Sequence, residues 1–201
     1  MTGSTTSVLR TLVLSDLVDS TALVERLGDQ RAADLIRKHD RLARSLMQQH
    51  GGREIDKTDG FLLLFDRAAD ALGYALDYHR ALAAIDPRLR ARAGIHVGAV
   101  TLRANDPADV ARGAKPLEVD GLAKPVAARV MALAGGGQTL LTAAAREALG
   151  TGVTAQLEPA GHWQFKGIAE PVALYAAAAD GGSAAALATP ADGDKGWRVV
   201  L

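Results

Sequence analysis

The chain has 201 residues, of which 48% are hydrophobic and none is cysteine, and its 23 basic residues balance 23 acidic ones. This length can enclose one substantial core, and the lack of cysteine excludes a disulfide framework and thiolate metal sites. The balanced charge indicates no nucleic-acid or membrane-surface partner. The first seven residues lack the features of a secretory signal, and no apolar stretch approaches the roughly 20 residues that cross a bilayer. We therefore expect a cytoplasmic protein without membrane insertion.

The first half of the chain alternates between strand and helix periodicity. A bounded apolar run predicts a buried strand at residues 12–17. Asp29 is expected to cap a long amphipathic helix that ends before Gly51. Two strand-like runs then flank the pair Asp59-Gly60, which is a strong hairpin signal. A further helix is predicted at residues 68–83.

The second half continues this alternation. We expect a second hairpin at residues 90–103, which turns at Gly98, and then a helix at residues 122–134. A short strand at 138–142, a short helix at 143–149 and a final strand pair within 162–177 follow. The order of elements fits an α+β sandwich, in which helices pack on a mainly antiparallel sheet.

Two aspartates, Asp16 and Asp59, each stand where a predicted strand gives way to a turn. If the first strand lies beside the hairpin, their carboxylates converge at one edge of the sheet. Paired carboxylates suit Mg²⁺ or Mn²⁺, which prefer oxygen ligands and are often held together with substrate phosphates. The alternative is that Asp16 caps the following helix and Asp59 only serves its turn.

Five segments, in chain order, resemble the motifs of class III nucleotide cyclases. They are residues 14–21 (LSDLVDST), 50–65 (HGGREIDKTDGFLLLF), 93–100 (AGIHVGAV), 127–130 (AARV) and 165–172 (FKGIAEPV). Each segment alone is a weak signal, but five in order span most of the chain, from about Arg10 to about Ala177. The resemblance implies the ferredoxin-like core of that family.

The resemblance also implies an activity and a set of residues for it. The chain would be a lyase that converts ATP to cyclic AMP and pyrophosphate, using two Mg²⁺ or Mn²⁺ ions held by Asp16, Asp59 and the Leu17 carbonyl. Arg129 would stabilise the transition state and Lys166 would grip the triphosphate, and the site would lie across a homodimer interface. Without the resemblance, Arg129 and Lys166 would be interpreted as solvated side chains.

Several positions depart from the family pattern. Ile55 occupies the slot of a purine-reading lysine, and Lys57 shares its face only if the strand stays regular. Pro125 replaces an asparagine that orients the ribose, and Thr58 replaces a glycine. Glu118 occupies the second purine-reading slot, and its carboxylate could accept from either purine. Weak selectivity, favouring ATP over GTP, is the expected result.

Three functional hypotheses and a domain plan follow. The first is an adenylate cyclase, the second a guanylate cyclase, and the third a catalytically silent, cyclase-like module that dimerises or senses nucleotides. Residues 1–9 are expected to be a disordered terminus and residues 10–179 the catalytic domain. Residues 180–201 are predicted to be a flexible linker leading to further C-terminal domains, although the run from Trp197 could instead dock on the domain as a strand.

Overall fold

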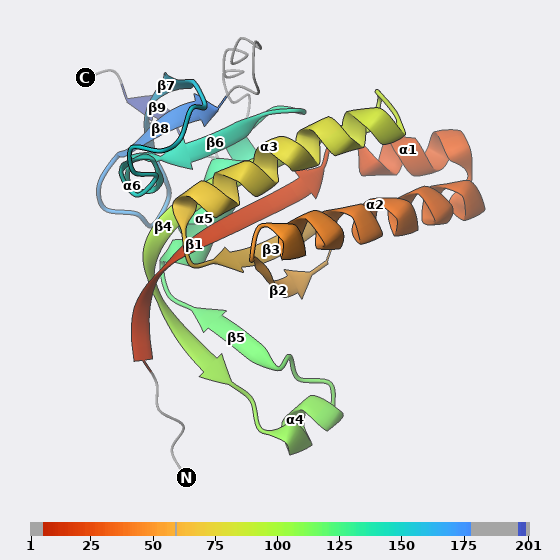
Figure 1. The fold of residues 1–201 in the computed structure, drawn as a ribbon, viewed down its shortest axis with the longest axis horizontal. Helices are drawn as coiled ribbons and strands as arrows, with labels where there is room; N and C mark the ends of the chain where they lie inside the picture. The colour runs from red at the N-terminus through yellow and green to blue at the C-terminus, as the bar shows by residue number, and fades with distance from the viewer. Residues whose placement is uncertain (1–5, 59, 178–196, 200–201) are drawn as a thin grey trace.

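A single open sheet runs through the protein, with helices on both of its faces (Figure 1). The computed structural model describes residues 6–58, 60–177 and 197–199. Its strands are β1 (Thr6–Leu17), β2 (Arg53–Lys57), β3 (Gly60–Phe65), β4 (Ala91–Ala104), β5 (Leu117–Asp120), β6 (Thr139–Thr142), β7 (Leu157–Gln164), β8 (Val172–Ala177) and β9 (Trp197–Val199). Its helices are α1 (Ser20–Leu27), α2 (Asp29–Gln49), α3 (Ala68–Ile85), α4 (Pro107–Ala111), α5 (Ala123–Leu133) and α6 (Ala143–Glu147).

The strand order is β2-β3-β1-β4-β6-β8-β7-β9, and β5 pairs with the C-terminal half of β4. Of the pairings between these strands, only β4 with β6 is parallel. The predicted α+β sandwich with a mainly antiparallel sheet is therefore confirmed. Among the described residues, no helix is long and apolar enough to cross a membrane.

The two faces of the sheet bury different side chains. The strand β1 alternates, so that Val13 and Leu17 join the large core beneath α2 and α3, while Leu12 points to the opposite face. On that opposite face, α5 packs its buried Ala127 and Val130 against the sheet. The two cores fix β1 in register between β3 and β4, which determines where its end at Asp16 lies.

Four sequence-based expectations need correction. The strand β4 runs straight through Gly98, where a hairpin turn was expected, and pairs with β5 beyond it. The strand β1 begins at Thr6, so residues 6–9 are not a disordered terminus. The N-cap of α2 is Gly28, and Asp29 is the first helical residue. At the other end, Trp197–Val199 form β9 and pair with β7, as in the docking alternative, so these three residues are not part of a flexible linker. The remaining residues of the predicted linker, 180–196 and 200–201, lie outside the described residues.

Candidate functional site

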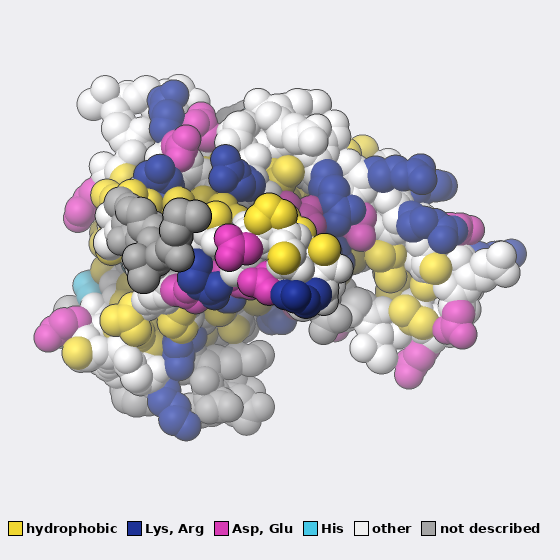
Figure 2. Space-filling model, turned by 90° about the horizontal axis from the view of Figure 1, so that it is seen from below, with side chains coloured by type: hydrophobic (Ala, Val, Ile, Leu, Met, Phe, Trp, Pro, Cys, Tyr) yellow, Lys and Arg dark blue, Asp and Glu magenta, His cyan; other side chains and the backbone are white. Residues whose placement is uncertain are grey.

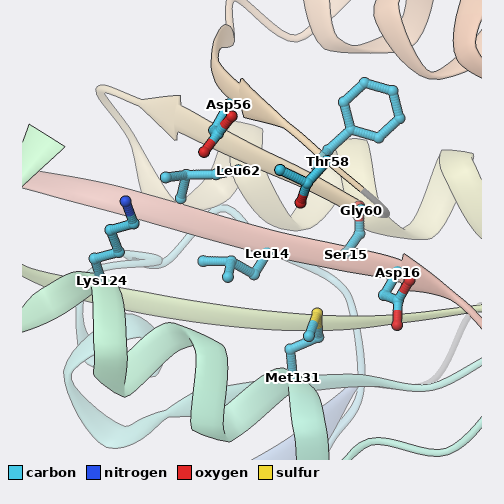
Figure 3. A pocket seen from close by; sticks show the side chains of 10 residues that line it. Leu14, Ser15, Asp16, Asp56, Thr58, Gly60, Leu62, Lys124 and Met131 are labelled. Atoms are coloured by element: carbon cyan, nitrogen blue, oxygen red, sulfur yellow. The ribbon is translucent and has the colours of Figure 1, made fainter. Parts of the chain in front are cut away.

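A pocket of about 290 Å³ opens where β1, β2 and β3 meet the helix α5 (Figure 3). Its lining combines apolar walls with two carboxylates and one ammonium group. The lining residues are Leu14, Ser15, Asp16, Asp56, Thr58, Gly60, Phe61, Leu62, Lys124 and Met131. Cavities of this size and composition are typical of small-molecule sites.

Asp16 reaches the pocket because it lies on the α5 side of β1, two residues after Leu14. Arg92, its partner in register on β4, donates from Nη2 to Oδ2 of Asp16 at 2.9 Å. Asp16 does not cap α1, since the N-cap of that helix is Asp19, which has a left-handed φ of 56°. The capping alternative for Asp16 is therefore wrong.

A β-bulge in β2 decides which side chains face the pocket. The register with β3 shifts between Glu54 and Asp56, so that Ile55 is the extra residue and Asp56 lies opposite Leu62. Ile55 is buried in the apolar cluster on the α5 side, and Asp56 lines the pocket itself. A bulge re-aims the residues that follow it, and here it brings a carboxylate into the pocket.

The same bulge moves Lys57 to the opposite face of the sheet. Lys57 lies opposite Phe61, with its Nζ 5.2 Å from the centre of that ring and 3.7 Å from Oδ1 of Asp40 on α2. It also donates to the carbonyl of Thr58 at 2.9 Å. The condition that Lys57 share a face with Ile55 is therefore not met, and Lys57 does not line the pocket.

Asp56 is held by cations. Nζ of Lys115, from the segment before β5, lies 2.5 Å from Oδ2 of Asp56. The hydrogen bond from Lys115, together with the charges of Lys115 and Lys124, lowers the pKa of Asp56 below its ordinary value. Asp56 is consequently ionised at neutral pH and acts only as a hydrogen-bond acceptor.

The candidate metal ligands can be placed only in part. Asp59 lies outside the described residues, but its neighbour Gly60 lies opposite Asp16 in register. A side chain at Gly60 would come within 2.1 Å of the Ser15 carbonyl, so this close approach requires glycine. Within the described part of the chain, no three His, Cys, Asp or Glu side chains gather as metal ligands.

Asp16 has the chemistry that a divalent cation needs. Its side chain is 21% exposed, and Arg92 engages only one of its oxygens. Within the described residues the other oxygen, Oδ1, has no hydrogen bond or ion pair, and the Leu17 carbonyl follows at the last residue of β1. Such oxygen donors fit Mg²⁺ or Mn²⁺.

The other predicted residues do not gather at this pocket within one chain. Arg129 is on α5 but lies five residues after Lys124 and two before Met131, which places it on another side of the helix. Lys166 is exposed in the turn between β7 and β8, and the strand pairings place that turn at the opposite end of the sheet from Asp16.

Glu118 also lies away from the pocket. It sits between Leu117 and Val119, which face the apolar cluster around Ile55, so its own side chain points to the other face of β5. Pro125 is the third residue of α5, within the first turn, where its missing N–H disrupts no helical hydrogen bond.

Sequence reasoning missed Asp56, Lys124, Lys115 and Arg92. Arg92 directly precedes the motif at residues 93–100 and Lys124 lies three residues before the motif at residues 127–130, so their positions beside these motifs were a usable signal. Asp56 carried no such signal, because an alternating pattern does not reveal a bulge.

No protein-family model and no curated protein matches the chain. Solved structures do match. An adenylate cyclase from Trypanosoma brucei, in its monomeric state, is 25% identical with a TM-score of 0.76, over 89% of this chain and 94% of that one. The adenylyl cyclase CyaB from P. aeruginosa is 17% identical with a TM-score of 0.78, over 87% and 96%. The guanylyl cyclase Cya2 is 21% identical with a TM-score of 0.76, over 91% and 98%. This chain therefore has the fold of the catalytic domain of class III adenylate and guanylate cyclases.

Proposed function

We propose that the chain is a cytoplasmic nucleotide cyclase that converts ATP to cyclic AMP and pyrophosphate, with GTP as the alternative substrate. The observation that carries this proposal is the position of Asp16, at the edge of a pocket of about 290 Å³ in a cyclase fold. The pocket offers apolar walls for a base, and Asp16 supplies a carboxylate where the strands end.

The reaction requires few chemical groups from the protein. The 3′-hydroxyl oxygen of the substrate forms a bond to the α-phosphorus, the bond from that phosphorus to the bridging oxygen breaks, and pyrophosphate leaves. The hydroxyl proton passes to solvent water in the same process. Asp16, Asp59 and the Leu17 carbonyl are the proposed ligands for Mg²⁺ or Mn²⁺, two ions per site, which would supply positive charge beside the phosphates.

A homodimer would complete the site. Arg129 lies on a side of α5 that does not line the pocket, and Lys166 is exposed at the far end of the sheet. Neither residue can serve the substrate beside Asp16 of its own chain in this arrangement. In the proposed two-fold dimer, each chain lends Arg129 and Lys166 to its partner. Arg129 would then stabilise charge on the α-phosphate through its fixed fork of donors.

A silent, nucleotide-sensing module is the second candidate. It is favoured by Pro125 and by the burial of Ile55 in an apolar cluster, because neither residue can orient a ribose or a base by hydrogen bonding. Such a module would bind nucleotide in the same pocket without forming a cyclic product.

The test is to incubate the purified chain with Mn²⁺ and either ATP or GTP, and to measure cyclic nucleotide and pyrophosphate. We expect equal amounts of the two products from the wild type, and a loss of at least about a hundredfold in Asp16→Ala, because a ligand of the reacting phosphates is removed. The variant should still fold, since Asp16 lies near a strand end, although the lost hydrogen bond from Arg92 should lower its unfolding temperature. Wild-type turnover in a folded Asp16→Ala protein would refute the proposal.

A further inference from the structure

The pocket contains an acid where a regular strand would have placed none. In β2, the bulge at Ile55 gives Asp56 the position opposite Leu62, on the face that α5 covers. Its side chain is 24% exposed and points into the pocket (Figure 3). Bulges beside active sites commonly serve to re-aim one side chain.

An ion pair with Lys115 holds Asp56 in this position. Lys115 contacts its Oδ2 at 2.5 Å and ties β2 to the segment before β5. The pKa of Asp56 is lowered by this hydrogen bond, so the carboxylate stays charged at neutral pH. The charge is held in place before any ligand arrives, which reduces the ordering cost of recognition.

A second polar group lies across the pocket. Lys124, from the first turn of α5, lines the pocket on the side facing Asp56, and the apolar side chains of Leu14 and Leu62 lie between them (Figure 3). The pocket therefore offers an acceptor and a donor on either side of an apolar surface. A flat heterocycle with a donor and an acceptor on its edge matches this arrangement.

We propose that Asp56 and Lys124 read the purine base of the substrate, in place of the residues at the Ile55 and Glu118 positions. Asp56 accepts from the 6-amino group of adenine, and Lys124 donates to a ring nitrogen of the same base. This inference rests on the proposed function, because it assigns specificity at the same site. It explains how the chain can recognise a base although Ile55 has no polar group and Glu118 faces away.

The alternative acids on neighbouring positions do not fit this role. Glu54, two residues before Asp56, accepts from Arg44 of α2 at 2.6 and 3.0 Å, away from the pocket. Glu118 faces the same side of the sheet as Arg103 of β4, its partner in register, and not the side with the pocket. Asp56 is thus the acid of β2 that the pocket presents, and Glu54 provides a matched control on the same strand.

The test pairs variants of the full chain with variants of the ligand. Binding of 3′-deoxy-ATP, which cannot cyclise, is compared by calorimetry with binding of its analogue lacking the 6-amino group. The wild type should lose about tenfold to a hundredfold in affinity when the amino group is removed, because one hydrogen bond to a charged carboxylate is lost. In Asp56→Ala this loss should shrink to less than about threefold, because the acceptor is already absent.

Controls separate the possible outcomes. Glu54→Ala should lose affinity as the wild type does, and Lys124→Ala should still respond to the amino group while binding both ligands more weakly. If Asp56→Ala does not fold, Asp56→Leu keeps a side chain branched at Cγ and also lacks the acceptor. The same loss in the Asp56 variant as in the wild type would overturn the proposal.

The result also distinguishes this inference from the proposed function. If the effect of the 6-amino group on affinity depends on Asp56, but neither ATP nor GTP yields a cyclic product, base recognition by Asp56 is supported and the cyclase activity is refuted. If cyclic product forms but removal of the 6-amino group lowers affinity equally with and without Asp56, base recognition by Asp56 is refuted and the cyclase activity is not. No binding of either ligand by the wild type refutes both.

Discussion

Two partly buried histidines flank β6 and make the stability of the protein depend on pH. His79 on α3 lies 2.9 Å from Oγ1 of Thr139, and His96 on β4 lies 3.0 Å from Oγ1 of Thr142. Burial lowers the pKa of each imidazole from 6.5 to about 4. Both rings therefore stay neutral in the folded protein at pH 5, whereas the unfolded chain protonates them.

The sign of the effect follows from these pKa values. Below pH 6.5 the unfolded state binds more protons than the folded state, so the free energy of unfolding falls as the pH falls toward 4. Between pH 6.5 and pH 5 we expect a loss of up to about 2 kcal/mol per histidine. Urea unfolding at the two pH values measures this loss. His96→Gln should reduce it, and an unchanged pH dependence in that variant would contradict the assignment.

Single residues also show where sequence reasoning stops. The end of β1 at Asp16 and the hairpin before Phe61 could be predicted, because hydrophobic pattern and turn chemistry agree there. The roles expected for Lys57 and Glu118 depended on the face of the sheet that each side chain occupies, and the sequence does not reveal that face. One bulge at Ile55 reverses that face for Lys57, and no local pattern reveals it.

At the scale of elements, the packing of α5 on β4 depends on glycines. An added Cβ at Gly94 would lie 2.3 Å from the backbone nitrogen of Met131 and 2.8 Å from the carbonyl of Ala127. At Gly98, an added Cβ would meet Ala123 at 2.9 Å. Gly98 was interpreted as a turn, but it is a position of close helix approach within a continuous strand. Glycine permits both, and only tertiary contacts distinguish them.

Gly94→Ala should therefore push α5 away from the sheet. We expect a destabilisation of about 1–3 kcal/mol in urea unfolding, as for overpacking of a close contact. Nucleotide binding should weaken as well, because Lys124 and Met131 move with the helix. Gly152→Ala is the matched control, since nothing lies within 4 Å of an added Cβ there. Equal stability of the two variants would show that α5 adjusts without cost.

On the scale of the whole molecule, charged and apolar side chains are exposed side by side on the surface. Figure 2 shows Lys, Arg, Asp and Glu side chains alternating with apolar ones on the face seen from below. Leu122, beside the start of α5, is 72% exposed. The α+β class could be predicted from the order of periodic segments, whereas α4 and β5 were not predicted.

The whole molecule also explains why one chain does not bring all the predicted site residues together. Asp16 lies at one end of the sheet, and Lys166 follows β7 at the other end. Arg129 belongs to a side of α5 that does not line the pocket. The proposed function therefore requires a composite site, built from two copies of the chain.

Mixing two inactive variants tests this central claim most directly. Asp16→Ala and Arg129→Ala should each be inactive alone, because every site in either homodimer lacks one essential group. After subunit exchange, the mixed dimer contains one intact site, and cyclic nucleotide formation should recover to about a quarter of the wild-type rate if subunits pair at random. A mixture that exchanges subunits, as shown by differently tagged chains, yet forms no cyclic nucleotide would contradict the account.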